Sequence, residues 1–355
     1  MNRFAFIIHP ISAEDIKKSL KPLSILPVPL LEAITKHLPP FKVSTIRGVR
    51  SLTGAETEGW FIGIPLTPRQ FLSYPLDFVY KRLIQAGKLA EKLGAKIVGL
   101  GAFTSVVGDG GITLAKNINI GVTTGNSYTV VTAVEGAIEA AKLVGINPKE
   151  AVAAVVGAGG SIGFTSARLL AREVPKMNII GRSVEKLEKV KETIEAETNC
   201  KVEIKRDVSE GLREADIVLT VTSAMEEIIF PEDLKRGAVV CDVARPRDVS
   251  KRVEEERRDV LVIEGGVVEV PGDVDFGFDF GFPPKTAYAC MAETMILALE
   301  GYEGSFTLGK EVTLEQADTI ARLAKKHGFR LAGFRSFEKP VLPERIEEVR
   351  RLAGR

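Results

Sequence analysis

The stretch Ala151–Ser183, AVAAVVGAGGSIGFTSARLLAREVPKMNIIGRS, decides the fold of this chain. It begins with a short apolar run, Ala151–Val156, which is typical of a strand buried on both faces. A glycine-rich turn follows at once, and the pattern then predicts a helix over Ser161–Val174 and a second strand over Met177–Gly181. A strand, a glycine turn, a helix and a strand in this order predict a βαβ unit that binds a nucleotide.

The glycines of this turn are explained by the demands of a phosphate site. The backbone must turn sharply and approach a pyrophosphate closely, which a Cβ atom would prevent. The helix that follows offers free N–H groups and the positive end of its dipole to the phosphates. The spacing is Gly-x-x-Gly-x-x-Gly, with Ile where the strict dinucleotide spacing has glycine. The predicted cofactor-binding residues of the turn are Gly157, Gly159, Gly160, Ser161, Ile162 and Gly163.

The end of the second strand indicates which nicotinamide cofactor the chain prefers. NAD sites usually carry Asp or Glu there, which bonds the ribose hydroxyls. This chain has Arg182 and Ser183 instead. The guanidinium can pair with a 2′-phosphate, and the serine hydroxyl can donate to it, so the sequence favours NADPH. The alternative is that Arg182 is a solvated residue at the start of the next helix.

Length and composition exclude several classes of protein. The 355 residues are enough for two domains, and the hydrophobic content of 45% can build real cores. The 48 basic and 47 acidic residues nearly cancel, so overall charge implies no nucleic-acid partner. No apolar run has the length of a membrane-spanning helix. Three cysteines without metal or disulfide spacing are typical of a reduced, cytoplasmic protein.

Strands and helices continue to alternate after Ser183. One predicted strand ends at Thr222 and Ser223, where such folds place the nicotinamide half of the cofactor, and another ends at Gly265-Gly266. We therefore expect an α/β protein with a doubly wound parallel-sheet (Rossmann) domain that binds NADPH. The expected boundaries are an N-terminal α/β substrate domain over 1–148, the NADPH-binding domain over 149–283 and a C-terminal helical segment over 284–355.

Two loops of the first domain are rich in small polar residues. Each follows a predicted strand, and their hydroxyl and amide groups suit recognition of a polar carbonyl or carboxyl group. The candidate substrate-binding residues are Thr104, Ser105, Thr124, Gly125 and Asn126. Helix capping is an equal alternative, since Asn126 or Ser127 would cap the long helix that follows.

The C-terminal third holds an aromatic segment and the candidate nucleophile. Phe276, Phe278, Phe280 and Phe282 alternate with Gly and Asp. On one side of an extended segment they would wall an apolar tunnel, although ordinary core is an equal interpretation. A helix is expected over Lys285–Glu300, which places Cys290 more than one turn from the helix start. A buried helical cysteine is usually a small hydrophobe. The sequence supports no Ser-His-Asp set, and its three histidines are too scattered to indicate a metal site.

Over most of its length the sequence resembles the aldehyde-forming long-chain acyl-[acyl carrier protein] reductases known from cyanobacteria, and more distantly the shikimate dehydrogenases. The matching blocks keep the family's order and similar spacing. They are Leu100–Val107, Thr123–Asn126, the glycine turn, Gly265–Glu269, Ala289–Met295, Phe306–Gly309 and Lys326–Phe329.

The resemblance implies an enzyme that acts through Cys290. A thioester of acyl carrier protein or coenzyme A would acylate the thiolate, NADPH would reduce the acyl-cysteine, and a fatty aldehyde would leave. Candidate donors to the oxyanion are Thr104, Ser105, Asn126 and the N–H groups of Gly265-Gly266. Cyanobacterial members work with an aldehyde-consuming partner enzyme, so such a partner is implied as well. The acyl length and the carrier stay open.

A second interpretation is an NADP-dependent dehydrogenase of the shikimate/quinate or amino-acid type without covalent catalysis. That chemistry needs a Lys–Asp acid/base pair in the first domain, which the sequence does not reveal. A third is a nucleotide-binding regulatory protein without catalysis, which would bind the cofactor and turn over no substrate.

Overall fold

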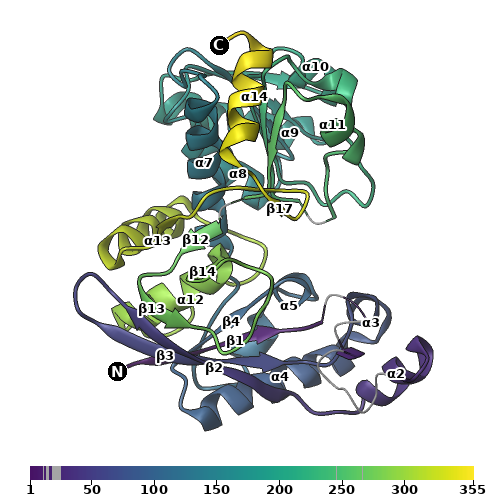
Figure 1. Ribbon diagram of the computed structural model, residues 1–355, viewed down its shortest axis with the longest axis vertical. Coiled ribbons are helices and arrows are strands. Elements are labelled where there is room, and N and C mark those ends of the chain that lie inside the picture. Colours follow the sequence, from purple (N-terminus) through teal and green to yellow (C-terminus); the bar gives the residue numbers. More distant parts are fainter. Residues whose placement is uncertain (11, 13–15, 18–24, 245, 266) are drawn as a thin grey trace. The chain divides into compact units, whose positions relative to one another are not determined.

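The computed structural model describes residues 1–10, 12, 16–17, 25–244, 246–265 and 267–355 (Figure 1). The chain forms two compact units. Unit 1 comprises Met1–Tyr128, Glu269–Glu311 and Thr319–Arg330, and unit 2 comprises Thr129–Val268, Val312–Asp318 and Leu331–Arg355. This division differs from the expected one, because the segment 284–355 is shared between the two units and forms no domain of its own.

Unit 2 contains a six-stranded sheet in which every neighbouring pair is parallel. The strand order is β8-β7-β6-β9-β10-β11. Counted from β6, this is the order 3-2-1-4-5-6 of dinucleotide-binding folds, which confirms the predicted fold class. The strands are β6 (Val152–Val156), β7 (Lys176–Ile180), β8 (Lys201–Lys205), β9 (Ile217–Thr220), β10 (Val239–Asp242) and β11 (Leu261–Ile263).

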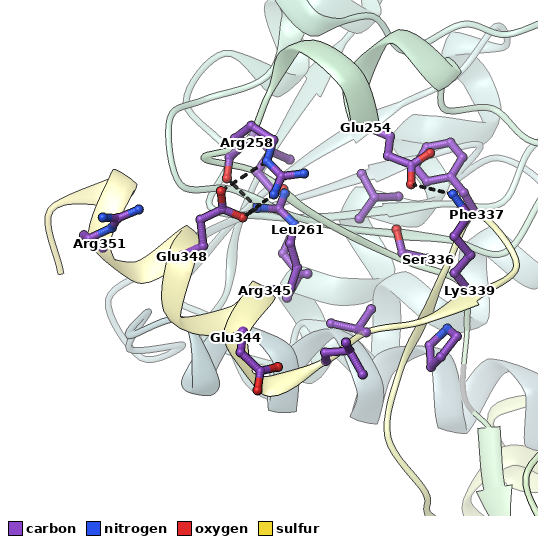
Figure 2. Close-up of a pocket in the computed structure, with 15 residues that line it drawn as sticks. Glu254, Arg258, Leu261, Ser336, Phe337, Lys339, Glu344, Arg345, Glu348 and Arg351 are labelled. Atoms are coloured by element: carbon purple, nitrogen blue, oxygen red, sulfur yellow. Dashed lines mark hydrogen bonds and ion pairs between the residues drawn. The ribbon is translucent and has the colours of Figure 1, made fainter.

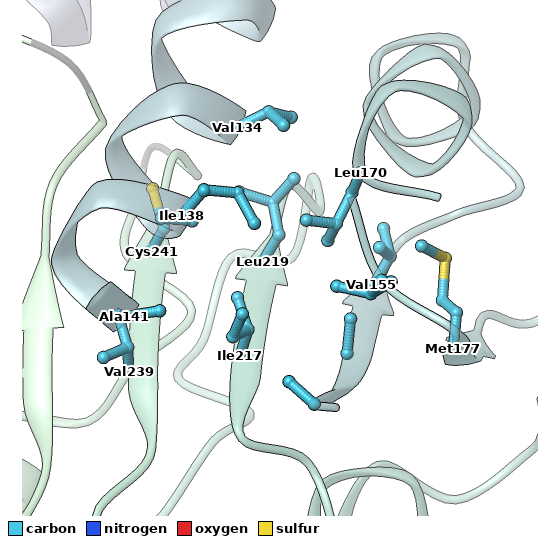
Figure 3. Packing of buried hydrophobic residues seen from close by; sticks show 14 of the residues in the cluster. Val134, Ile138, Ala141, Val155, Leu170, Met177, Ile217, Leu219, Val239 and Cys241 are labelled. Carbon is cyan, nitrogen blue, oxygen red and sulfur yellow. The ribbon is translucent and has the colours of Figure 1, made fainter. Parts of the chain in front are cut away.

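Both faces of this sheet are buried. Along β6, Ala153 and Val155 belong to one hydrophobic cluster, while Ala154 and Val156 belong to another. The first cluster includes side chains of α7, α8, α9 and α14, and Figure 3 shows part of it, including Cys241. The second cluster is covered by α10 and α11. The helices of unit 2 are α7 (Asn126–Leu143, which begins in unit 1), α8 (Ser161–Leu170), α9 (Val184–Glu197), α10 (Val208–Leu212), α11 (Lys251–Glu256) and α14 (Pro343–Ala353), with the 3-10 helix η2 (Pro231–Asp233).

Unit 1 contains a mixed six-stranded sheet of order β13-β2-β3-β1-β4-β5. Strands β3, β1, β4 and β5 are parallel, and β2 and β13 add an antiparallel edge. The strands are β1 (Arg3–Ile8), β2 (Phe41–Arg50), β3 (Glu56–Gly63), β4 (Ile97–Leu100), β5 (Gly121–Thr123) and β13 (Gly272–Asp275). The helices are α2 (Val28–Thr35), α3 (Pro68–Ser73), α4 (Leu76–Leu93), α5 (Phe103–Val106), α6 (Ile112–Ala115), α12 (Ala289–Glu300) and the last two turns of α13 (Leu314–His327).

Helix α12 packs on one face of the unit 1 sheet and α4 contacts the same strands from the other face (Figure 1). The face toward α12 carries glycine at the point of closest approach. A Cβ atom on Gly99 would lie 2.0 Å from Oγ1 of Thr294 and 2.5 Å from the ring of Phe6. The glycine therefore allows α12, which carries Cys290, to lie directly against β4.

The expected helix over Lys285–Glu300 is wrong at its start. Thr286–Tyr288 form strand β14, and α12 begins at Ala289. Strand β14 belongs to a three-stranded sheet with β12 (Val267–Glu269) and β15 (Arg330–Leu331). Pairing with a distant segment thus fixes residues that the local pattern assigns to the helix. A two-stranded ribbon of β16 (Arg335–Ser336) and β17 (Lys339–Pro340) completes the described elements.

The aromatic segment is also not the extended strand that its alternation predicts. Gly277 and Gly281 have φ angles of +61° and +81°. Their N–H groups donate to the carboxylates of Asp275 and Asp279, both at 2.8 Å. Two consecutive Asp-Phe-Gly turns therefore replace a straight segment.

In the described part of the chain, no helix is long and apolar enough to span a membrane. The same residues include no group of three or more His, Cys, Asp or Glu side chains that could hold a metal ion.

Candidate active site

The glycine turn of unit 2 has the geometry of a phosphate site. Gly157 has φ +88°, and a Cβ atom on Gly163 would lie 2.1 Å from the carbonyl oxygen of Gly157. Gly160 is the N-cap of α8 and its side chain position is open, with no atom nearer than 3.4 Å. The first N–H groups of α8 have no partner within the helix, so they can donate to an anion. The turn therefore fits the pyrophosphate of a dinucleotide.

Ser161 has a second role beyond the predicted one. Its hydroxyl accepts the N–H of Val312 at 2.9 Å, and Thr165 on the same helix donates to the Val312 carbonyl at 2.5 Å. Both contacts lie within unit 2. The Ser161 side chain thus holds a neighbouring loop, and what it offers a cofactor is its backbone N–H. Ile162 is half-buried, and its backbone N–H lies in the first turn of α8, as that of Ser161 does.

Arg182 and Ser183 lie at the start of α9, and both are exposed. Ser183 is the N-cap of the helix and accepts the N–H of Lys186 at 3.4 Å. Lys186 is a residue that the sequence analysis missed: its Cβ lies 3.4 Å from the position that a side chain on Gly159 would take. The sequence could have indicated it, because Lys186 lies in the first turn of the helix that begins after Ser183. Lys186 thus lies beside the glycine turn, and Arg182 and Ser183 precede it at the start of the same helix.

Thr222 lies against the other side of the turn, and its hydroxyl is already bonded. Its methyl group is 3.2 Å from the Cβ position of Gly157. The Thr222 hydroxyl and N–H donate to Asp248 at 2.5 and 3.1 Å, and Thr220 donates to the same buried carboxylate. Asp248 was missed because nothing in the local sequence links it to β9. Thr222 therefore faces the glycine turn with its methyl group, while Asp248 holds its hydroxyl and N–H. Ser223 is exposed, Gly265 has φ +38°, and Gly266 lies outside the described residues.

Cys290 occupies the second position of α12, after the N-cap Tyr288. The residue is partly exposed, whereas Cys200 and Cys241 are buried. Although the residue as a whole is partly exposed, its thiol is enclosed by neighbouring atoms. This burial raises the pKa of the Cys290 thiol to about 12, and the charge of Glu293 adds to the rise. The N–H groups of Met291 and Cys290, at the positive end of the helix, act in the opposite direction on this pKa. The resting thiol is therefore protonated, and the helix start lies much closer to it than the sequence predicted.

A buried carboxyl group lies one turn further along the helix. Glu293 is 0% exposed. It accepts hydrogen bonds from Thr123 Oγ1 at 2.5 Å, Tyr128 N–H at 2.7 Å and Thr307 Oγ1 at 3.1 Å. Burial raises the pKa of this carboxyl group, although these three donors and the N–H of Gly125 oppose the rise. Since the Thr307 proton goes to Glu293, Ser127 donates to Thr307 across their 2.7 Å contact.

This network fixes the β5–α7 loop, Thr123–Ser127, against Cys290. Gly125 has φ +75°, and a Cβ atom there would lie 2.3 Å from both Cα and Cβ of Cys290. Thr124 lies beside this contact, and its buried Oγ1 has no hydrogen-bond partner among the described residues. Asn126 is the first residue of α7 and is half-buried. Of the predicted substrate residues, Gly125 is therefore placed in contact with Cys290, and Thr124 and Asn126 flank it.

Thr104 and Ser105 instead stabilise a turn. The Thr104 hydroxyl donates to the Gly101 carbonyl at 2.7 Å and accepts the Gly101 N–H at 3.0 Å. The Ser105 hydroxyl donates to the Ala102 carbonyl at 2.7 Å. Ala102 has φ +48°, so these bonds hold a strained turn after β4. Their hydroxyl protons are therefore already donated within the turn.

The structure does contain a Ser-His-Glu row that the sequence analysis did not find. Ser51 Oγ lies 2.9 Å from His327 Nδ1, and His327 Nε2 lies 2.9 Å from Glu300. The Ser51 hydroxyl is buried and also accepts the Thr53 N–H at 3.0 Å. The row therefore connects the β2–β3 turn to α13 and α12 of unit 1, and we assign it a structural role.

A cavity of about 500 Å³ lies elsewhere in unit 2, beside β11 and α14 (Figure 2). None of the predicted site residues lines it. Among its charged side chains, Arg258 and Arg345 pair with Glu348, and Lys339 pairs with Glu254. Because these charges are neutralised locally, we assign no ligand to it.

Comparison with known proteins supports the interpretation of unit 2. Residues 139–264 match the family described as shikimate / quinate 5-dehydrogenase. The aminotransferase PigE of Serratia sp. is 29% identical over 98% of this chain and 42% of that protein. The long-chain acyl-[acyl-carrier-protein] reductase of Synechococcus elongatus is 28% identical over 79% of this chain and 84% of that protein.

The chain thus spans less than half the length of the first of these relatives. Among solved structures, L-tryptophan dehydrogenase from Nostoc punctiforme is 14% identical and covers 99% of this chain and 86% of that chain, with a TM-score of 0.39. The family match over residues 139–264 and the sheet of unit 2 together show the nucleotide-binding fold of NAD(P)-dependent reductases and dehydrogenases.

Proposed function

We propose that the protein is an NADPH-dependent reductase that converts a long-chain acyl thioester to a fatty aldehyde through an acyl-cysteine at Cys290. The carrier is acyl carrier protein or coenzyme A. The observation that carries the proposal is the position of Cys290: it is partly exposed at the second residue of α12 and lies against Gly125. The similarity to a protein named as a long-chain acyl reductase supports the same chemistry.

The residues of unit 1 have distinct parts in the first step. Cys290 loses its proton, and its sulfur forms a bond to the acyl carbon while the bond to the carrier sulfur breaks; the carrier thiol takes up the proton. The N–H groups at the start of α12 stabilise the thiolate against burial. The Thr124 hydroxyl, which has no partner among the described residues, is our candidate donor to the thioester oxygen. Glu293 is a positioning residue that holds the loop carrying Thr124 and Gly125.

The residues of unit 2 bind and select the cofactor in this proposal. The glycine turn and the start of α8 would hold the pyrophosphate, and Arg182, Ser183 and Lys186 would hold the 2′-phosphate. NADPH would supply the hydride that reduces the acyl-cysteine to the aldehyde, and Cys290 would leave as the thiolate.

The alternative dehydrogenase needs a Lys–Asp pair. Within the described part of unit 1, Lys285 and Asp273 form such an ion pair at 3.0 Å, but the Asp273 side chain is 97% exposed. The two functions separate in one experiment. NADPH oxidation is followed with palmitoyl-coenzyme A, palmitoyl-acyl carrier protein, shikimate and amino acids, for the native chain, Cys290→Ala and Asp273→Asn. We expect aldehyde from a palmitoyl thioester that depends on Cys290 and not on Asp273. Turnover of shikimate or an amino acid that depends on Asp273 would contradict the proposal.

A further inference from the structure

Four partly exposed aromatic side chains form a continuous row in unit 1. The row consists of Phe278, Phe280, Phe282 and Tyr288. Successive ring centroids are 6.3, 5.5 and 4.4 Å apart. Phe278 and Tyr288 are 40% and 47% exposed, and Phe280 and Phe282 are partly buried. Contiguous exposed rings are unusual on a protein surface and mark a place where an apolar partner binds.

The row has a rigid base. Phe61 of β3 is fully buried, and its ring lies 6.3 Å from Phe278 and 5.8 Å from Phe280. Phe276, which is 8% exposed, packs against Phe280 at 5.1 Å. These two rings are ordinary core, whereas the four rings above them are not. The two Asp-Phe-Gly turns described above hold the backbone of the segment, so the row is preformed.

The row ends beside the candidate nucleophile. Tyr288 is the N-cap of α12, and Cys290 follows two residues later. Two residues of chain span at most about 7 Å, so the Tyr288 end of the row and the Cys290 backbone are held close together. Every residue of the row and Cys290 belong to unit 1. The Tyr288 end of the aromatic row and the backbone of Cys290 are therefore neighbours within unit 1.

We propose that this aromatic row is the binding surface for the hydrocarbon chain of the thioester, and that it sets the preference of the enzyme for long chains. The inference rests on the proposed function and adds the site that recognises the acyl tail. The occupant is an acyl chain because the Tyr288 end of the row lies two residues from Cys290, the residue that would carry the acyl group. With the carbonyl carbon at the sulfur, the tail extends past Tyr288 and Phe282 toward Phe280 and Phe278.

The physical consequence is a graded dependence on chain length. Each methylene group buried against the rings improves binding about fourfold, until the tail extends past Phe278. Removing the rings at the far end removes this gain for long chains and leaves short chains, which contact only the near end, unaffected.

The test measures acylation of Cys290 by intact-mass spectrometry without NADPH, using coenzyme A thioesters of 4, 8, 12 and 16 carbons. The variants are Phe278→Ala, which changes an exposed ring and therefore affects folding little, and Phe278→Ala/Phe280→Ala. Tyr302→Ala is the matched control, because Tyr302 is a 37% exposed aromatic residue near the opposite end of α12. Thermal unfolding and sedimentation accompany each variant.

We expect acylation of the native chain to accelerate with chain length, and both variants to lose at least tenfold with the 16-carbon thioester while they keep the native rate with the 4-carbon one. An equal loss at every length, or a loss equal to that of Tyr302→Ala, would overturn the inference and leave the proposed function intact. A change of oligomeric state without a length effect would also overturn it, because the row would then be an interface between copies. Failure of every thioester to acylate the native chain would instead overturn the proposed function.

Discussion

Two opposing influences act on the sulfur of Cys290. The start of α12 favours the thiolate, while burial and the charge of Glu293 raise the pKa of this thiol to about 12. A thiol with a raised pKa resists oxidation and alkylation when no substrate is bound. In our account, reactivity therefore increases with pH and responds to the charge at position 293.

Replacing Glu293 by Gln tests this balance. The amide removes the negative charge but keeps one oxygen that can accept from Thr123 and Thr307. We expect alkylation of Cys290 by iodoacetamide at pH 8 to become faster, by up to about tenfold for one unit of pKa. The free energy of unfolding falls by about 1–3 kcal/mol, because the Tyr128 N–H loses its acceptor. Mass spectrometry follows the alkylation, with Glu303→Gln as a control at an exposed site; a slower or unchanged rate in Glu293→Gln would refute this description.

A second prediction at the residue scale concerns the choice of cofactor. Arg182→Ala and Lys186→Ala each remove a cation from the proposed 2′-phosphate site. We expect each to raise the KM for NADPH by about 10- to 100-fold, the value of a charge-assisted hydrogen bond, and to leave the KM for NADH unchanged. Lys189→Ala, on the same helix, is the control. Equal losses with both cofactors would mean that these cations do not select the 2′-phosphate.

At the scale of elements, the β5–α7 loop and the start of α12 form one assembly. The loop contacts Cys290 through Gly125, which has φ +75°. Glu293, one turn further along α12, accepts hydrogen bonds from the Thr123 hydroxyl and the Tyr128 N–H. Any side chain at position 125 must displace either the loop or the helix.

Comparing Gly125→Ala with Gly54→Ala separates the cost of a left-handed backbone from the cost of a steric clash with Cys290. Gly54 has φ +86° with no atom within 4 Å of its Cβ position, so alanine there costs only the left-handed conformation, about 1–2 kcal/mol. At position 125 the clash with Cys290 adds about 1–3 kcal/mol. We expect chemical denaturation to show this difference and acylation of Cys290 to be lost only in Gly125→Ala. Equal stability losses and native acylation in both variants would contradict the assembly.

The elements that the sequence predicted well are those that local chemistry determines. The strand, glycine turn and helix of Ala151–Val174 depend on apolar runs and on glycine, both readable from neighbouring residues. The start of α12 was predicted wrongly because Thr286–Tyr288 pair with the distant strand β12, which the local pattern does not contain. The Phe276–Phe282 alternation was likewise overridden by Asp–Gly turns, which the repeated Asp-Phe-Gly could have indicated.

At the scale of the whole molecule, the site predicted from sequence was incomplete for a simple reason. Glu293 and Thr123 form a hydrogen bond although 170 positions separate them in the sequence. Asp248 and Thr222 do the same across 26 positions. Contacts of this kind depend on the folded sheet, so spacing in the chain does not reveal them. Cys290 was identified only through a family resemblance, and the residues that position it became visible only in the structure.

Stability of the chain depends on a buried histidine. Burial lowers the pKa of His327 below its usual value of 6.5, although Glu300 opposes this. His9 is shifted in the same direction by burial. The unfolded chain therefore binds protons more readily than the folded one, so the free energy of unfolding falls as the pH decreases below about 6.5. We expect denaturation at pH 7.5 and 5.5 to show this loss, and His327→Gln to reduce it relative to the exposed-site control His37→Gln. If the free energy of unfolding depended equally on pH in the two variants, His327 would not contribute to the loss of stability at low pH.

The central claim is that Cys290 carries the acyl group. The most direct measurement is intact-mass spectrometry of the native chain and Cys290→Ala after mixing with palmitoyl-acyl carrier protein or palmitoyl-coenzyme A in the absence of NADPH. We expect one added palmitoyl mass on the native chain alone, and its discharge as aldehyde when NADPH is added. An absent adduct, or an adduct that persists in Cys290→Ala, would contradict the covalent mechanism.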